Sequence, residues 1–509
     1  MAKSKLLFQP GEDWNPDMLD KIWHEIEIIA KELEISYYEP QFEIISSDQM
    51  LEAYVTTGMP MMYKHWSFGQ SAIVQKQDYE NGKMGLAYEM VINSDPCIAY
   101  LMESNNALMQ TLVMAHASVG HSAVYKNNVY FRENTDATSI IPYIDFAKKF
   151  ITKCEAEHGI DTVERVLDAC HAIQIYGVDK YRRRGKRSPK KLTDKVAEFD
   201  LMHHTLMDHS KANDGVVGGR DPGYMEPEEN ILYFIEKRAP NLEPWQREII
   251  RIVRKISQYF LPQRQMQIVH EGYASFTHYY IMHRLYDKGL ISDGSMLEFY
   301  ASHSGVLTQH SYKHTSQLNP YRFGFKMFMD IKKKAEEAGK HWQTEVNYAM
   351  QNFNDESFIA QYLSLEVAQD FGLFGTSMNN DESLIEVREI PRNGRMLDEL
   401  KIRLSRQHSL SYRVPDIQVV GVDVEGDRTL FLEHFTNKEE TRKLDSLDAL
   451  YTLEAIKSLW GHRVRLISPD LRKKDTEYEK IDDTTVVEKG TKTLSGHIGE
   501  LRGRPFLEA

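Results

Sequence analysis

The spacing of apolar residues predicts that roughly the first 370 residues are mostly helical. From Pro16 to Leu33, apolar side chains recur every three or four residues, which is the period of one face of an α-helix. An alternating stretch at 38–45 predicts a short strand, and 50–57 predicts a short helix. The helical period returns, with polar residues at the segment ends, in 105–124, 141–158, 161–175, 244–259, 263–285, 296–303 and 320–338.

The pattern changes after about residue 380. Short β-prone runs separated by Asn, Gly, Asp and Pro turns occupy 384–390, 400–404, 417–424, 429–434 and 463–467. A helix predicted at 446–460 interrupts them, which is typical of an α+β module. We therefore predict a mainly α domain over 1–375 and a smaller α+β domain over 380–509.

A basic and glycine-rich excursion separates two of the predicted helices, at about 181–227. It begins with YRRRGKRSPKK and continues into DGVVGGRDPG, whose Gly and Pro residues are typical of loops. The candidates for contact with an anion or an acidic partner are Arg182, Arg183, Arg184, Lys186 and Arg187. The alternative is a solvated loop.

Composition and charge place the chain among ordinary folded proteins. With 41% hydrophobic, 27% charged and 11% aromatic residues, wholesale disorder and collagen-like character are excluded. Because 62 Lys and Arg oppose 75 Asp and Glu, the net charge is −13, and the surface as a whole repels nucleic acid and anionic membranes. Neither is an expected partner, although the basic excursion is a local exception.

Cysteine usage and apolar run lengths indicate the compartment. The three cysteines form no CxxC pair, which fits a reducing compartment and argues against a Cys-rich zinc site. The first residues lack the long apolar core of a secretory signal. Apolar stretches such as 107–119 fall short of the about 18 to 20 residues that span a bilayer. We expect a cytoplasmic protein.

The unusual feature is histidine, of which there are 20, some in apolar helices. His116 and His121 are five residues apart in one predicted helix. On a regular α-helix that interval separates them by about 140°, but a π-bulge or a helix end at Gly120 would let both point into one cavity. The alternative is two core histidines, each hydrogen-bonded to a backbone carbonyl.

A second candidate group lies in HEGYASFTHYYIMH, residues 270–283. Glu271 and His278 are seven apart, so they differ by about 20° around a helix and share one face. Ala274 and Ser275 between them would allow another helix to approach closely. Imidazole and carboxylate ligands suit zinc, and also iron or manganese. The segment is not an HExxH motif, and a packed core helix with paired polar groups is the alternative.

Two weaker candidates complete the search. Glu89 lies between apolar residues, where burial would raise its pKa and suit it to acid–base work, unless it pairs with an arginine. His303, His310 and His314 precede a helix that starts with Pro, and we predict that they are surface or packing residues. The sequence has no GxSxG, Walker or strand-linked GxGxxG motif, so serine hydrolase, P-loop and Rossmann functions have no support.

Long motifs in order resemble the stage V sporulation protein R family over nearly the whole chain. They include AYEMVINSDPCIAYLMESN, AHASVGHSAVYKNN, APNLEPWQREIIRIVR, HEGYASFTHYYIM and LNPYRFG. The resemblance implies a role in spore cortex formation in sporulating bacteria. Elsewhere it implies stress and starvation responses, in association with a PrkA-type serine protein kinase and a partner with a von Willebrand-like domain. It brings no established biochemical activity.

The resemblance also bears on the candidate residues. His116, His121, Glu271 and His278 are characteristic of the family pattern, whereas the position of His270 can hold Asn. It implies a zincin-like arrangement of helices in which His116, His121 and Glu271 hold a metal. His278 would be a fourth ligand or would contact one of the ligands from behind. Ala117 stands where a zincin has its catalytic Glu.

These observations lead to two main hypotheses of different classes, and phosphate or nucleotide sensing through Arg182 to Lys191 is a third possibility. The first is a metal-dependent hydrolase of amide bonds, in peptides or peptidoglycan-related molecules, with zinc as the expected ion and Glu89, or Glu271 if it is not a ligand, as proton acceptor. The second is a non-catalytic regulatory or scaffold protein in the kinase pathway. Its histidines would be buried for packing, and the C-terminal module and basic excursion would be docking surfaces.

Overall fold

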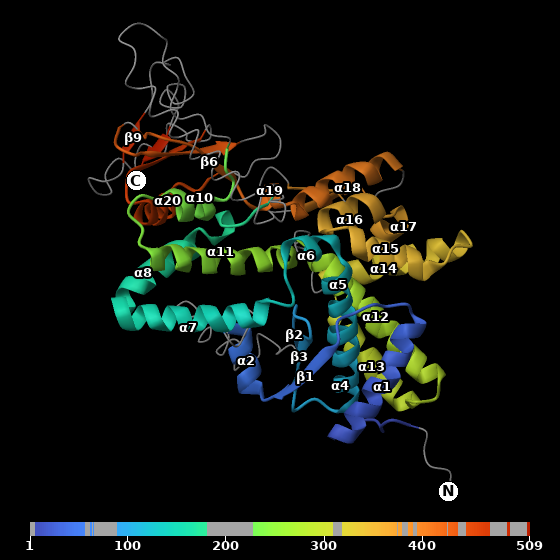
Figure 1. Ribbon diagram of the computed structural model, residues 1–509. Coiled ribbons are helices and arrows are strands. Elements are labelled where there is room, and N and C mark those ends of the chain that lie inside the picture. Colours follow the sequence, from blue (N-terminus) through green and yellow to red (C-terminus); the bar gives the residue numbers. More distant parts are fainter. Residues whose placement is uncertain are drawn as a thin grey trace. The chain divides into compact units, whose positions relative to one another are not determined.

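We describe a computed structural model of the chain (Figure 1). It describes residues 6–55, 62–63, 65, 89–180, 227–308, 318–373, 375–378, 385–389, 394–424, 426–435, 444–468, 486–488 and 506–508. The basic excursion at 181–226, including Arg182, Arg183, Arg184, Lys186 and Arg187, lies outside these residues, as do His310 and His314.

The chain forms two compact units, and each is built from two separate stretches of the sequence. The first contains residues 1–160 and 259–413, and the second contains 161–258 and 414–509. The compact units therefore divide the chain elsewhere than at the predicted boundary between residues 375 and 380. The broad prediction is confirmed: a mainly α body is followed by a C-terminal α+β region.

Helices make up most of the first unit. They are α1 (Pro16–Glu32), α2 (Ser47–Val55), α4 (Ala107–Val113), η1 (Met114–His121), α5 (Ser122–Asn127), α6 (Val129–Asn134), α7 (Ile140–His158), α12 (Gln267–Asp287), α13 (Asp293–Val306), α14 (Pro320–Glu337), α15 (Trp342–Asn352), α16 (Asp355–Tyr362), α17 (Leu365–Asp370), α18 (Gly394–His408) and α19 (Leu410–Arg413). Helix α11 (Pro244–Gln265) contributes residues to both units.

Local sequence explains where these helices start. At α14, the Asn319 side chain accepts hydrogen bonds from the backbone N–H groups of Tyr321 and Arg322, and Pro320 occupies the first helical position. At α12, the carboxylate of Asp355 accepts from the N–H groups of Ile268 and Val269 at 3.0 and 2.9 Å. Helix α12 is therefore capped by a side chain from α16.

Helix α12 runs through the middle of the unit, between η1 and α14 (Figure 1). Its Tyr273 and Phe276 belong to a buried cluster shared with α14 to α18. Its Ile281, Met282 and Leu285 belong to a second cluster shared with α1, α4 and η1. Because both cores use this helix, side chains in its middle are held rigidly on two sides.

Two small sheets accompany the helices. β1 (Pro40–Ile45) is parallel to β3 (Cys97–Met102), which pairs antiparallel with β2 (Glu89–Ile92). β4 (Gly375–Met378) and β5 (Ile385–Glu389) form a hairpin. The strands predicted near 38–45 and 384–390 are therefore confirmed. The strand predicted at 400–404 is wrong, because α18 covers it: Leu397, Leu400 and Leu404 follow a helical period that buries the last two.

The second unit is an α+β structure. Its helices are α8 (Ile160–Ala172), η2 (Gln174–Tyr176), α10 (Ile231–Arg238), most of α11 and α20 (Ser446–Trp460). Its sheet has the order β6-β7-β8-β10-β9, formed by Asp416–Val422, Leu430–Phe435, Val464–Ile467, Phe506–Glu508 and Val486–Glu488. The strands predicted at 417–424, 429–434 and 463–467 and the helix predicted at 446–460 are confirmed.

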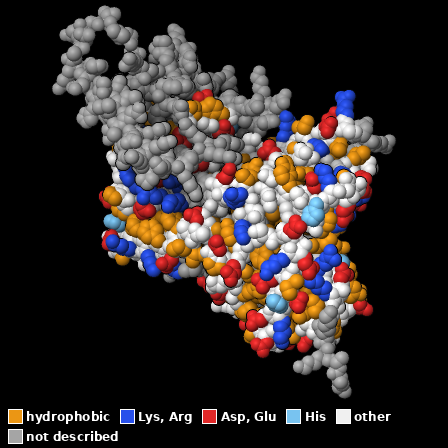
Figure 2. All heavy atoms as spheres, turned by 45° about the vertical axis from the view of Figure 1, so that its right-hand side comes forward, with side chains coloured by type: hydrophobic (Ala, Val, Ile, Leu, Met, Phe, Trp, Pro, Cys, Tyr) orange, Lys and Arg blue, Asp and Glu red, His pale blue; other side chains and the backbone are white. Residues whose placement is uncertain are grey.

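The surface agrees with the mixed composition. On the face shown in Figure 2, acidic and basic side chains of the described residues are interspersed with apolar ones. Among the described helices, none is both long and apolar enough to cross a membrane.

Candidate metal centre

The helix that carries His116 and His121 changes its winding at these residues. Between α4 and α5, the eight buried residues of η1 form a π-helix. The N–H of Ser122 bonds to the carbonyl of Ala117, five residues back. Since this winding brings residues five apart onto the same side, the two histidines face one direction. The conditional prediction of a π-bulge is confirmed.

A close helix crossing places this π-helix against α12. A Cβ atom added to Gly120 would lie 2.6 Å from the Cα of Ala274, so the two backbones meet where neither residue has a large side chain. The small residues of 270–283 therefore have the predicted effect. They bring the histidines of η1 over the face of α12 that carries Glu271.

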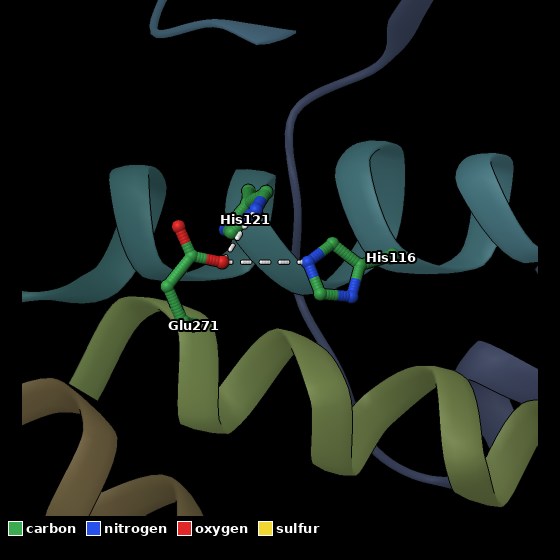
Figure 3. A group of neighbouring side chains, drawn as sticks. All are labelled: His116, His121 and Glu271. Atoms are coloured by element: carbon green, nitrogen blue, oxygen red, sulfur yellow. Dashed lines mark ion pairs between the residues drawn. The ribbon is translucent and has the colours of Figure 1, made fainter. Parts of the chain in front are cut away.

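Three side chains converge at this crossing (Figure 3). The Nε2 atoms of His116 and His121 lie 3.6 and 3.5 Å from Oε2 of Glu271. One ligand atom from each of the three residues lies within 4.8 Å of the others, so the group could hold a metal ion. Ligands about 2.1 Å from a tetrahedral zinc are about 3.4 Å apart, close to both nitrogen–oxygen distances. The donor set and its spacing therefore fit a divalent cation.

Burial sets the charge state of the surrounding imidazoles. His116 and His121 are 2% and 5% exposed, whereas the Glu271 side chain is 19% exposed. Desolvation is the main cause that holds the pKa of His121 well below its ordinary value, and the neighbouring histidines lower it further. Desolvation also lowers the pKa of His270 to about 4. Neutral imidazole is the form that binds metals, so His121 needs no deprotonation before it binds an ion.

His278 lies behind His116 rather than beside Glu271. Its Nδ1 is 2.7 Å from Nδ1 of His116, and its Nε2 is 2.8 Å from Nδ1 of His303. It is not in the group of three ligand atoms. His278 is expected either as a fourth ligand or as a residue that contacts a ligand. The structure favours the second, because His278 contacts His116.

Aromatic rings enclose the ligands. His270 stacks on His121 with ring centroids 4.0 Å apart, and Tyr125 lies 4.8 Å from His270. Tyr321, at the start of α14, lies parallel to His116 at 6.3 Å. The sequence did not single out Tyr125 or Tyr321. Tyr321 belongs to LNPYRFG, in which a capping Asn before Pro marks a helix start, and that signal could have found it.

A second close crossing brings Tyr321 to the site. A Cβ atom on Gly272 would lie 2.4 Å from the Cα of Gly324, and one on Gly324 would lie 2.2 Å from the carbonyl oxygen of Ile268. Helix α14 therefore contacts α12 backbone to backbone, one residue after Glu271. Glycine at both positions is what permits this approach.

The remaining sequence candidates divide into two groups. His303, expected at the surface or in packing, is buried in α13, because Phe299 four residues earlier and Met296 lie on the same inward face. The surface option for His303 is therefore wrong. Glu89 starts β2, a strand that lies against η1, but its side chain is outside the described ones. Its proposed role stays a prediction.

Comparison with known proteins gives the family. The family described as "SpoVR like protein" matches residues 13–412, and "SpoVR-like C-terminal domain" matches 415–470. The chain belongs to the SpoVR family. The "Uncharacterized protein YcgB" of Escherichia coli (strain K12) is 43% identical over 488 residues, which cover 92% of this chain and 94% of that protein. No solved structure matches.

The SpoVR match is also informative about domains and the site. The junction between the two matched segments, at residues 412–415, coincides with one of the points where the chain passes from one compact unit to the other, at 413/414. His116, His121 and Glu271 all lie in the longer SpoVR segment. The relative's description gives no activity, so chemistry has to be argued from the side chains.

Proposed function

We propose that this SpoVR protein is a metal-dependent hydrolase of amide bonds, with zinc held by His116, His121 and Glu271. The observation that carries the proposal is the convergence of three ligand atoms from η1 and α12. Two histidines and one glutamate form a ligand set of catalytic zinc sites, and three protein ligands leave positions for water and substrate. When bound, the ion would polarise a carbonyl and lower the pKa of water.

The protein's own residues supply the rest of the site. His121 and His270 are kept neutral by burial, and the aromatic rings around them limit the access of bulk water. Since Ala117 replaces the zincin glutamate and Glu271 is assigned to the metal, we assign proton acceptance to Glu89. Support for this assignment is the packing of its strand, β2, against η1.

The proposed substrate class rests on the family resemblance and not on the geometry. The role in spore cortex formation that the resemblance to the stage V sporulation protein R family implies is our reason for proposing peptide or peptidoglycan-related amides as substrates. We place this activity in the cytoplasm, in agreement with the cysteine usage. Iron or manganese in place of zinc would point to a different chemistry, because two histidines and one carboxylate also bind Fe(II) in oxygenases.

The activity can be tested directly. We expect zinc-loaded protein to release new amino groups from short peptides or from peptidoglycan-derived peptides. His121→Ala and Glu271→Ala should abolish this release, and the exposed His24→Ala variant should retain it. Absence of amide hydrolysis in a zinc-loaded, folded protein would overturn the hydrolase proposal, even if the metal site exists.

A second candidate function is regulation through docking. On α20, Leu447 and Tyr451 are 40% and 69% exposed and lie one turn apart, so they present an apolar strip to solvent. We propose this strip as a contact for the PrkA-type kinase or for the partner with a von Willebrand-like domain. Loss of binding to either partner in Leu447→Asp/Tyr451→Asp, with hydrolysis unchanged, would support this function. Unchanged binding of both partners would contradict it.

A further inference from the structure

Three buried histidines form a continuous row that starts at the metal centre. His116 lies in η1, His278 in α12 and His303 in α13. Nδ1 of His116 is 2.7 Å from Nδ1 of His278, and Nε2 of His278 is 2.8 Å from Nδ1 of His303. Both distances are those of hydrogen bonds. Two imidazoles therefore stand in series behind one proposed metal ligand.

Proton counting allows few arrangements in this row. A neutral imidazole has one N–H donor and one nitrogen acceptor, and each hydrogen bond needs one of each. If Nε2 of His116 binds a cation, its proton is on Nδ1, and His278 must accept at Nδ1. His278 then carries its proton on Nε2 and donates it to Nδ1 of His303. One tautomer for each ring follows.

Burial keeps His278 and His303 neutral. Desolvation, strengthened by the other histidines, holds the pKa of His278 well below its ordinary value and lowers that of His303 to about 4. Each of the two contacts in the row needs only one proton, so three neutral rings satisfy both hydrogen bonds. With all three rings neutral, two proton arrangements are possible: every N–H in the row points toward His303, or every N–H points toward His116.

Packing fixes the far end of the row. The His303 ring lies parallel to Phe299 with centroids 5.3 Å apart and edge-on to Phe325 at 5.1 Å. Within the described residues, its Nε2 has no hydrogen-bond partner. In the arrangement described above, this nitrogen carries the proton of His303.

We propose that His278 and His303 are positioning residues, which set the tautomer of His116 so that its Nε2 lone pair faces a divalent cation. This inference rests on the proposed metal centre. Metal-binding histidines commonly donate their second ring N–H to a fixed acceptor, and losing that acceptor typically costs 10–100-fold in affinity. Here the acceptor is a neutral imidazole, itself oriented by another imidazole.

Zinc affinity in matched variants tests the proposal. His278→Leu removes the acceptor, and we expect zinc to bind about 10–100-fold more weakly. His278→Asn places an amide oxygen near the position of Nδ1 and should restore most of the affinity. His303→Leu should weaken binding less. The control is His283→Leu on the same helix, whose imidazole bonds to Tyr300 and to the carbonyl of Tyr279, outside the row, and whose affinity should not change.

A spectroscopic readout does not depend on the folding of any variant. In zinc-loaded protein with ¹⁵N-labelled histidine, we expect the proton of His116 on Nδ1 and those of His278 and His303 on Nε2. A proton on Nδ1 of His278 would overturn the inference, as would equal zinc affinity in His278→Leu and the wild type. If His116→Ala itself binds zinc as the wild type does, the metal centre fails instead, so the two failures are distinguishable.

Discussion

At the scale of single residues, the histidines differ in how far their sequence neighbours indicate their neighbours in the folded protein. His116 and His121 could be paired from the sequence once a π-bulge was considered, because five-residue spacing fits that winding. His303 could not, because its neighbours in sequence are a histidine-rich segment, whereas its neighbours in space are Phe299 and His278. Proximity to one another in the folded protein, rather than composition, separates the functional candidates from the other histidines.

Asp355 offers a residue-scale prediction about stability and pH. Its carboxylate caps α12 and is fully buried, and desolvation raises its pKa from 3.8 to about 7. A raised folded-state pKa means that the folded protein keeps a proton which the unfolded chain loses. This contribution to stability is full below pH 4 and is lost as the pH rises to about 7.

We therefore expect Asp355→Asn to be less stable than the wild type at pH 4, by about 1–3 kcal/mol, since one buried N–H of α12 loses its acceptor. The difference should shrink between pH 4 and 7. Urea unfolding at several pH values measures it. A difference that grows with pH would contradict the assignment of a buried, protonated Asp355.

At the scale of elements, two glycine crossings position the site. Gly120 lets η1 approach Ala274, and Gly272 lets α14 approach through Gly324. The sequence indicated the first crossing through the small residues after Glu271, but not the second. A single glycine within a helical pattern does not reveal its partner, because that partner is distant in the chain.

Gly120→Ala tests the first crossing. The added Cβ would come within 2.6 Å of the Cα of Ala274, so the two helix backbones must separate. We expect unfolding to become easier by about 1–3 kcal/mol and zinc binding to weaken, because His116 and His121 move away from Glu271.

The matched control is Gly305→Ala. Gly305 is a helical glycine in α13 with nothing within 4 Å of an added Cβ, so alanine there should stabilise slightly. Thermal unfolding and zinc titration of both variants provide the comparison. Equal behaviour of the two would show that the crossing does not set the site.

Element prediction failed where short windows were ambiguous. Residues 400–404 are apolar and basic, and five residues fit either a strand or a helix. The spacing of the leucines from Leu397 to Leu404, taken over the longer segment, fits the helix α18 and not a strand. The strands β2 and β3 are not predicted for a related reason: they are short, and pairing determines them more than local propensity does, since β3 pairs with the distant β1 and β2 pairs with β3.

At the scale of the whole molecule, the proposed metal centre belongs to one of the two compact units. The three ligands lie in the first unit, which is assembled from 1–160 and 259–413. The sequence located the change to α+β structure but not this division. Residues 161–258 join the C-terminal region through contacts such as the β-bridge between Glu228 and Val419. A local sequence pattern does not predict such a long-range contact.

Zinc should therefore protect one unit. At a concentration about 100 times its dissociation constant, a bound ion stabilises the folded state by about 2.7 kcal/mol. We expect slower amide hydrogen exchange in peptides covering η1 and α12, and little change in peptides covering β6, β7 and α20. His116→Ala should show no protection. Zinc-induced protection of equal size in that variant would place the ion elsewhere.

The central claim is that His116, His121 and Glu271 form a metal centre. Elemental analysis of protein expressed and purified without an affinity tag tests it most directly. The geometry predicts about one equivalent of a divalent transition metal, with zinc first, in the wild type and in His24→Ala, and none in His116→Ala or Glu271→Ala. A wild type without bound metal, or an unchanged metal content in those two variants, would contradict it.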